Sequence, residues 1–348
     1  MIKIKKFVYF LIITVIINIF LFDFNCETAS AYTQSQAECV IELNSNRVIY
    51  SKNENAKLPM ASTTKILTAL TVIENYDLEK IITVPKQSVG IEGSSIYLRE
   101  GEHLKVKELL YGLMLRSGND CAECLALTCG NGKEEFIDLM NKTARKYGAN
   151  NSNFTNPHGL HDVNHYTTAY DLCLISLNAM KNPIFKEIVS TKRVEISNEG
   201  YSYKRVLINK NKMLLNFDGC NGVKTGFTKK AGRCLVSSAE RDGANYVCVV
   251  INSPQMWERS KELLNYCFDN YSYKEIVNID DYNNQIYTAS NGKKFTITMY
   301  KNFNYPLSES EIKDVNIKIN GQNYQDFIKN PINKNMKLMI FCKIGKFL

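Results

Sequence analysis

The chain has 348 residues and a net charge of +8, with 45% hydrophobic and 22% charged residues. This composition excludes wholesale disorder and allows one large domain followed by a small one. The basic excess favours association with an anionic surface such as membrane lipid or a wall polymer. Because there is no dense Lys/Arg tract and no basic–aromatic repeat, we expect no nucleic acid as a partner.

The N-terminal segment is typical of an export signal. Three lysines among the first six residues precede an apolar run over 7–22, and Ala29-Ser30-Ala31 has the small-x-small form that a signal peptidase cleaves. We therefore predict a signal peptide over 1–31 and export to the extracellular face of the cytoplasmic membrane or to the cell wall. The apolar run is long for a signal, so an uncleaved membrane anchor stays open as an alternative.

The next elements are a hairpin and a series of helices. Two β-rich runs around Asn44-Ser45-Asn46 predict the hairpin. A helix over 62–76 is apolar nearly all round, which indicates a helix buried in the middle of a domain. Further helices are expected at 106–115, from about 120, at 133–147 and at 168–180, before Pro183.

Strands return in the second half. Short strands are expected at 193–196 and 205–208, and two runs at 234–239 and 245–251 bracket a turn that predicts a hairpin. A helix containing Trp257 follows. This order predicts an α+β fold in which helices cover an antiparallel sheet.

The amino-acid composition and the hydrophobic pattern change beyond about residue 273. Asn and Lys become frequent, and apolar residues alternate with polar ones at 295–300 and 315–319. We therefore predict a large domain over 32–272 and a small β-rich domain over 273–348. The apolar tail at 337–348 is expected to be a final strand, because a membrane-surface helix would need a distinct polar face.

Eleven cysteines occur in the chain, and most of them lie inside apolar runs. In that setting a free cysteine behaves as a small hydrophobe. Cys121 and Cys124 could begin a zinc site, but no second cysteine pair and no paired histidine follows at ligand spacing. We therefore expect no metal.

A serine followed three residues later by a lysine occurs three times, beginning at Ser62, Ser290 and Ser310. Among these, Ser62 opens a buried helix, and the spacing puts the Lys65 amine on the same face as the Ser62 hydroxyl. Burial and a second cation, for which Lys224 is the candidate, would lower the pKa of Lys65 and make it a base for the serine. The alternative is that Ser62 is only a helix N-cap.

Ser117 and Asn119 stand between two predicted helices, where a loop can direct side chains into a cleft. The Ser117 hydroxyl could relay a proton between Lys65 and a leaving amine. The Asn119 amide could hold a substrate amide through paired hydrogen bonds, and it could also cap the following helix.

The tripeptide Lys-Thr-Gly occurs once, at 224–226. Lys224 would supply a positive charge for a carboxylate, and the hydroxyls of Thr225 and Thr228 could donate to it. Gly226 removes a side chain where a substrate backbone must pass. The backbone N–H of Phe227, with that of the nucleophile, could form an oxyanion hole.

Together the three motifs, in this order and spacing, resemble the serine-type D-Ala-D-Ala carboxypeptidases of peptidase family S11, the low-molecular-mass penicillin-binding proteins. The resemblance covers about residues 37–272 and extends to the segments 59–61, 156–160 and 168–171. It implies a β-lactamase/transpeptidase-like fold in which the helix-covered antiparallel sheet carries a helical subdomain.

The resemblance also implies an activity. Such an enzyme removes the terminal D-alanine from peptidoglycan stem peptides through an acyl-enzyme on Ser62, needs no cofactor, and is inhibited by β-lactams. Lys65 would then be the base, Ser117 and Asn119 the second catalytic pair, and residues 224–226 the strand that binds the substrate carboxylate.

One departure from the family concerns the carboxylate. Family members often carry an arginine just before an aromatic residue near position 257, but here Met256 stands in that place and Arg259 follows. The residue that replaces this arginine is left open.

Three other functions are alternatives. A D,D-endopeptidase that cuts peptidoglycan cross-links would use the same residues. A β-lactamase would need a glutamate that positions water, and the segment 156–160 offers none. A non-catalytic wall-binding protein would not need a nucleophile paired with a base.

Overall fold

A computed structural model describes residues 34–198, 200–278, 280, 286–288, 294–296, 302–314, 318–319 and 322–323. The predicted signal peptide and the predicted final strand lie outside these residues and stay predictions. Within the described ranges, none of the helices has the length and apolar character that a membrane crossing requires.

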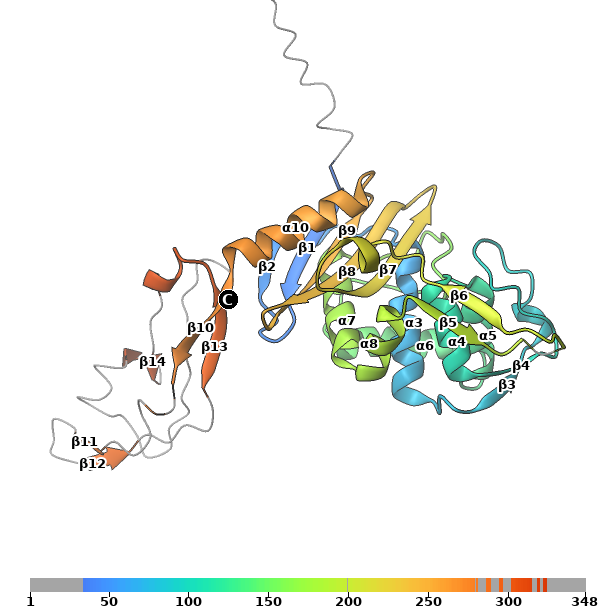
Figure 1. Cartoon of the computed structure of the whole chain (residues 1–348), viewed down its shortest axis with the longest axis horizontal. Coiled ribbons are helices and arrows are strands. Elements are labelled where there is room, and N and C mark those ends of the chain that lie inside the picture. The colour runs from blue at the N-terminus through green and yellow to red at the C-terminus, as the bar shows by residue number, and fades with distance from the viewer. Residues whose placement is uncertain are drawn as a thin grey trace, which may run out of the picture. The chain divides into compact units, whose positions relative to one another are not determined.

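The centre of the structure is a five-stranded antiparallel sheet with the order β2-β1-β9-β8-β7 (Figure 1). Its strands are β1 (Ala37–Glu42), β2 (Val48–Lys52), β7 (Cys220–Thr228), β8 (Gly232–Arg241) and β9 (Ala244–Ile251). Both predicted hairpins are confirmed. The turn between β8 and β9 places Asp242 and Gly243 at positive φ angles of 49° and 79°, which suits a tight hairpin turn.

Helices cover both faces of the sheet. In β9, Val247, Val249 and Ile251 face the larger core, whereas Cys248 and Val250 face a second core beneath α10. Because alternate residues of a strand point to opposite faces, a strand buried on both faces is a continuous apolar run. Figure 1 shows α10 on one side of the sheet and α7 with α8 on the other.

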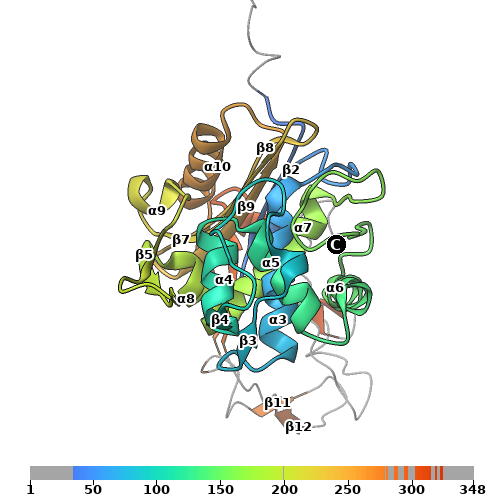
Figure 2. The ribbon, with the colours of Figure 1, turned by 90° about the vertical axis from the view of Figure 1, so that its right-hand side faces the viewer.

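The helices that build these layers begin and end as follows. They are α3 (Lys65–Asn75), α4 (Val106–Leu115), α5 (Asn119–Thr128), α6 (Lys133–Lys146), α7 (Ala169–Lys181), α8 (Pro183–Ser190), α9 (Met213–Asn216) and α10 (Met256–Asn270). Figure 2 shows α3 to α6 gathered into a largely helical part beside the sheet. The predicted α+β architecture with a helical subdomain agrees with this arrangement.

Two details differ from the prediction. The helix expected from residue 62 begins with a 3₁₀ turn, η1 (Ala61–Thr64), before α3. Pro183 does not simply end a helix, because it stands in the first turn of α8, where a missing N–H costs nothing. The Asn182 side chain caps α8 by accepting from the N–H groups of Ile184 and Phe185, at 2.9 and 3.2 Å.

Shorter elements complete the described chain. Before residue 272, antiparallel pairs outside the main sheet are β3 (Ile81–Thr83) with β4 (His103–Lys105), and β5 (Arg193–Ile196) with β6 (Arg205–Ile208). The short 3₁₀ turn η2 covers Lys86–Ser88. The strands predicted at 193–196 and 205–208 are thereby confirmed.

The C-terminal region contains strands, as expected. β10 (Ser272–Val277) pairs with β13 (Phe303–Leu307), β11 (Ile286–Thr288) with β12 (Lys294–Thr296), and β14 (Lys318–Ile319) with β15 (Gln322–Asn323); η4 covers Ile312–Asp314. The boundaries 1–31, 32–272 and 273–348 stay predictions.

Candidate active site

The turn that carries Ser62 is held by its own neighbours. The Thr63 hydroxyl donates to the Met60 carbonyl at 2.7 Å, and the Thr64 hydroxyl donates to the Ala61 carbonyl at 2.8 Å. The N-cap positions of η1 and α3 are Met60 and Thr64, and neither helix is capped by a side chain. Ser62 is therefore not an N-cap, and its hydroxyl is left for another role.

A histidine that was not predicted as a site residue supports the same turn. His165 Nδ1 accepts from the N–H of Thr155 at 3.0 Å, so the proton of a neutral ring is on Nε2. Nε2 then donates to the Thr64 hydroxyl at 2.8 Å, which itself donates to Ala61. Burial lowers the pKa of His165 to about 4, so the ring stays neutral near pH 7.

Lys65 is fully buried and has three hydrogen-bond partners. Its Nζ lies 3.0 Å from Ser62 Oγ, 2.7 Å from Asn119 Oδ1 and 2.6 Å from the carbonyl oxygen of His158. The amide and carbonyl oxygens can only accept, whereas the hydroxyl can also donate. A neutral Lys65 would keep its two N–H groups on those oxygens and turn its lone pair to the Ser62 hydroxyl.

Electrostatics favour this neutral form. Burial, followed by the nearby charge of Lys224, holds the pKa of Lys65 well below its ordinary value. Lys224 is itself buried on β7, and burial followed by repulsion from Lys210 lowers its pKa to about 7. Two lysines with depressed pKa values thus act on one another electrostatically, and Lys65 Nζ lies 3.0 Å from the Ser62 hydroxyl.

Asn119 connects the lysine to a neighbouring loop. Its Oδ1 accepts from Lys65, its Nδ2 donates to the Glu92 carbonyl, and its backbone N–H donates to the Ser94 carbonyl at 2.7 Å. Asn119 is the first residue of α5, and the N-cap position belongs to Gly118, so the alternative capping role of its side chain is wrong.

Ser117 lies in the short link between α4 and α5. It is buried, and its φ of 64° is in the left-handed region that non-glycine residues rarely adopt. Such positions cluster at functional sites, where the surrounding structure holds the backbone against the strain. The proton relay proposed for its hydroxyl stays a prediction.

The edge strand β7 passes close to the turn that carries Ser62. A Cβ atom added to Gly226 would lie 3.0 Å from the Met60 carbonyl oxygen and 3.2 Å from the Ser62 nitrogen. Glycine therefore allows the strand to approach the turn this closely. The Lys224 ammonium donates to the Thr225 carbonyl at 3.0 Å.

The other two predicted residues of β7 lie towards its end. The Phe227 side chain is 65% exposed, so its predicted contribution is from its backbone. Thr228 Oγ1 accepts from the N–H of Ala231 at 3.0 Å, which leaves its hydroxyl proton available for a donor role.

The loop 156–160 supplies a partner that the sequence did not reveal. It gives two backbone carbonyls to α3: Pro157 accepts from Thr68 at 2.7 Å, and His158 accepts from Lys65. A Cβ on Gly159 would lie 1.9 Å from the Ala61 carbonyl oxygen, so this position requires glycine. The segment was noticed in the sequence, but a carbonyl partner cannot be read from it because every residue has one.

Lys210 is a third lysine near the site, and it too was missed. Its ammonium donates to Ser94 Oγ at 3.1 Å, and its charge lowers the pKa values of both Lys65 and Lys224. Burial, followed by repulsion from Arg116, lowers the pKa of Lys210 itself. It therefore adds positive charge to the site.

Family members often carry an arginine near position 257, where this chain has Met256 and Arg259. Neither of these two residues provides a free cation. Met256 is buried in the core beneath α10. The Arg259 guanidinium makes two bonds to Glu38, at 2.8 and 2.9 Å, and one to the Tyr50 hydroxyl at 3.0 Å. Lys210 and Lys224 are the other lysines of this site with lowered pKa values.

Comparison with known proteins places this site in a family. The family model described as Peptidase_S11, D-alanyl-D-alanine carboxypeptidase, matches residues 25–255. The chain belongs to this family. The match spans both the nucleophile turn and β7, so the resemblance predicted from the sequence is confirmed.

Relatives and solved structures agree with this membership. The chain is 29% identical to the D-alanyl-D-alanine carboxypeptidase DacF of Bacillus subtilis over 331 residues, covering 92% of this chain and 85% of that protein. It is 31% identical to the D-alanyl-D-alanine endopeptidase of Escherichia coli, covering 60% and 70%. A crystal structure of a mutant DD-transpeptidase from Streptomyces K15 superposes with a TM-score of 0.64 at 31% identity, covering 68% and 98%. The transpeptidase-like fold is thereby confirmed.

Proposed function

We propose that this serine-type D-Ala-D-Ala carboxypeptidase removes the terminal D-alanine of peptidoglycan stem peptides, with Ser62 as its nucleophile. The observation that carries the assignment is the 3.0 Å contact between Lys65 Nζ and Ser62 Oγ, made by a fully buried lysine whose other two bonds go to oxygens that only accept. A serine hydroxyl needs such a base before it can attack a carbonyl.

In the first half-reaction Ser62 Oγ attacks the carbonyl carbon of the peptide bond between the two D-alanines, and its proton passes to Lys65. The N–H groups of Ser62 and Phe227 are the proposed donors to the oxyanion, and the close approach of Gly226 to the Ser62 nitrogen supports this. As the C–N bond breaks, the leaving amine takes the proton from Lys65 by way of the Ser117 hydroxyl. The product is an ester on Ser62.

In the second half-reaction a water molecule attacks the ester carbon and gives a proton to Lys65. The C–O bond to Ser62 then breaks, and the serine oxygen recovers the proton. A β-lactam would enter by the same acylation step and remain on Ser62 as long as water attacks its ester slowly. We therefore include β-lactams as inhibitors.

We assign the substrate carboxylate to Lys224 on β7. A buried ammonium without an acidic partner is costly, so a carboxylate that pairs with Lys224 both binds and restores the pKa of the lysine. The hydroxyls of Thr225 and Thr228 are proposed as further donors, and Asn119 is proposed to hold the peptide amide. No step of this scheme requires a cofactor.

Family members act on the cell wall, outside the cytoplasm. For this chain we propose export directed by residues 1–31, with the net positive charge favouring contact with the anionic wall or membrane surface. A second candidate function, cleavage of D-alanyl cross-links, is favoured by the similarity to the Escherichia coli endopeptidase.

The test is acylation by a fluorescent penicillin. We expect labelling of the wild-type protein and of Ser190→Ala, a change on α8 that serves as the control, and no labelling of Ser62→Ala. Release of free D-alanine from diacetyl-Lys-D-Ala-D-Ala separates a carboxypeptidase from a protein that cuts only cross-links. Equal labelling of Ser62→Ala would remove the assigned nucleophile.

A further inference from the structure

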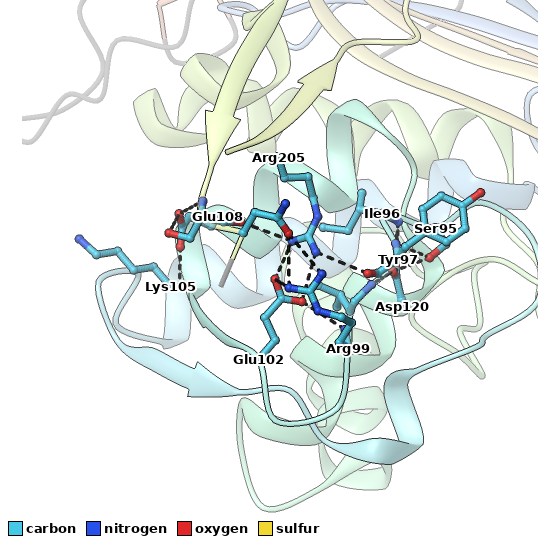
Figure 3. A network of polar contacts seen from close by, with 12 residues as sticks. Ser95, Ile96, Tyr97, Arg99, Glu102, Lys105, Glu108, Asp120 and Arg205 are labelled. Atoms are coloured by element: carbon cyan, nitrogen blue, oxygen red, sulfur yellow. Dashed lines mark hydrogen bonds and ion pairs between the residues drawn. The ribbon is translucent and has the colours of Figure 1, made fainter. Parts of the chain in front are cut away.

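A loop beside the catalytic residues is pinned by a buried carboxylate. Asp120 follows Asn119 at the start of α5, and its carboxylate accepts from the Ser95 hydroxyl at 2.6 Å and from the N–H groups of Ile96 and Leu98, both at 3.1 Å (Figure 3). Because Asn119 also donates its own N–H to Ser94, this loop is fixed relative to the site.

Tyr97 lies between Ile96 and Leu98, whose N–H groups donate to Asp120, and it is exposed to water. Its side chain is 82% exposed, and its φ is 62°, in the left-handed region. Its N–H donates to Ser95 Oγ at 2.8 Å, and its carbonyl accepts from Arg205 at 3.4 Å. The fold therefore holds a bulky side chain outward in a conformation that such residues avoid, which is a feature of ligand-binding positions.

Two further exposed tyrosines are linked to this loop by arginines. Glu102 is almost fully buried and pairs with Arg205 at 2.9 Å and with Arg99 at 3.6 Å (Figure 3). The Arg99 guanidinium lies 4.5 Å from the centre of the Tyr201 ring, and the rings of Tyr201 and Tyr203 are 5.2 Å apart. Both rings are more than half exposed.

These contacts connect two segments with exposed rings, which we call the tyrosine platform: Tyr97 on one segment, and Tyr201 and Tyr203 on the other, linked through Arg205, Glu102 and Arg99. Single exposed apolar side chains are ordinary, but a group of rings from two separate segments, joined by guanidinium groups on one buried glutamate, is an organised surface. Tyrosine and arginine are also the residue types that concentrate binding energy at interfaces.

We propose that the tyrosine platform binds the glycan strand of peptidoglycan while a stem peptide of that strand occupies the site at Ser62. This inference rests on the proposed function, because it takes the substrate to be attached to a glycan. The flat C–H faces of pyranose rings suit aromatic rings, and the partly exposed Arg99 guanidinium suits the acetamido oxygens and the carboxylates of the peptides. Exposed rings on two separate segments suit a polymer better than they suit a free peptide.

Binding is measured without turnover. In a Ser62→Ala background, we expect Tyr97→Ala to weaken sedimentation with insoluble peptidoglycan about tenfold, and Tyr201→Ala with Tyr203→Ala to weaken it further. Tyr97→Gly removes the ring and relieves the backbone conformation, so an equal loss in that variant excludes misfolding as the cause. Tyr266→Ala, an exposed tyrosine on α10, is the matched control and should bind as the parent does.

The polymer dependence is tested with two further probes. The parent should also bind peptide-free glycan strands prepared with an amidase, and loss of binding on removal of the peptides would overturn the assignment to glycan. In the active enzyme, Tyr97→Ala should lower kcat/KM on polymeric peptidoglycan about tenfold more than on diacetyl-Lys-D-Ala-D-Ala.

The outcomes are separable from those for the proposed function. Platform variants that sediment like the parent would overturn this inference, whatever the enzyme does to D-Ala-D-Ala peptides. A wild-type protein that releases no D-alanine from the soluble peptide would instead contradict the proposed function, which the sedimentation assay does not measure.

Discussion

Lys65 on α3 and Lys224 on β7 are both buried at the same site, yet their surroundings differ. Lys65 has three oxygen partners from three separate parts of the chain. Lys224 bonds to the carbonyl of the residue that follows it. The hydrogen-bonding capacity of Lys65 is thus filled by partners within the protein. The hydrogen bond described for Lys224, in contrast, is to a carbonyl of its own strand.

This difference indicates two roles for one residue type. Lys65 is surrounded by two oxygens that only accept and by one hydroxyl that can also donate. These partners suit a neutral amine that takes the proton of the hydroxyl. An ammonium buried without a carboxylate partner is arranged to receive one from a ligand. Burial lowers the pKa of both lysines, so the division of roles that we propose rests on their hydrogen-bond partners and not on their burial.

The largest expected effect comes from removing the base. Lys65→Met should slow acylation of Ser62 about 10³-fold, because a positioned general base contributes about 10²- to 10⁴-fold. The rate of labelling by fluorescent penicillin measures this. Lys146→Met, at an exposed lysine on α6 that pairs with Glu74, is the control and should label at the wild-type rate.

The Lys65 variant also tests folding. Methionine fills a similar volume and removes a buried amine, but it leaves the Asn119 and His158 oxygens without their donor, so we expect a folded protein with a moderately lower melting temperature. A Lys65→Met protein that is folded and still acylated rapidly would contradict the role of Lys65 as base.

Removing the binding lysine should act mainly on affinity. Lys224→Met should raise KM for diacetyl-Lys-D-Ala-D-Ala about 10- to 100-fold, since a hydrogen bond to a charged group is worth about 1.5–3 kcal/mol. The same peptide with an amidated C-terminus should lose little, because it offers no carboxylate. Equal losses for the two peptides would show that Lys224 does not recognise the carboxylate.

The pH dependence follows from the pKa of Lys224, which burial lowers to about 7. As pH rises through this value the free enzyme loses the positive charge, so kcat/KM for a carboxylate substrate should fall up to about tenfold per pH unit above 7. The substrate carboxylate favours the charged form, so the decline in kcat should occur at higher pH. Lys224→Arg keeps its charge and should remove the alkaline decline; an unchanged profile would assign the decline to another group.

A smaller effect is expected where β7 meets the nucleophile turn. Gly226→Ala would put a methyl group 3.0 Å from the Met60 carbonyl oxygen, so the strand or the turn must shift. We expect a loss of about 1–3 kcal/mol in the free energy of unfolding and a severalfold slower acylation. Chemical denaturation and penicillin labelling measure the two effects. Gly243→Ala, strained by its φ of 79° in the β8–β9 turn, should lower stability without slowing acylation and so separates the two.

The smallest effect on activity is expected at Arg259. Arg259→Gln should leave kcat/KM within about twofold of the wild type, because its guanidinium is bound to Glu38. Stability should fall by about 1–3 kcal/mol, since the Glu38 carboxylate stays buried without its partner. A large rise in KM with unchanged stability would instead assign carboxylate binding to Arg259.

Much of this molecule could be predicted from local patterns. The helix at 106–115 and the strands at 193–196 and 205–208 have the predicted boundaries, because their apolar periodicity and flanking residues are local. The 3₁₀ turn before α3 and the helix that begins at Pro183 were not predicted. At Pro183 the local signal is present, because Asn182 and Pro183 suit the N-cap and first turn of a helix, but the same proline also ends the helix before it. The 3₁₀ turn carries no comparable local signal.

The sequence by itself determined which residues are available for chemistry. Ser62 and Lys65 are three residues apart, and that spacing puts them on one face in any helical turn. The three motifs, read together, also determined the family. Local spacing and side-chain chemistry are properties that a linear sequence contains directly.

The tertiary structure decided what those residues contact. The carbonyl of His158 on Lys65, the pairing of Arg259 with Glu38, and the backbone conformation of Tyr97 depend on segments that are distant in the chain. Backbone carbonyls are the same in every residue, and a buried ion pair needs both of its partners placed. Packing therefore decided that Lys65 has partners from distant segments, whereas the bond described for Lys224 is to the next residue of its own strand.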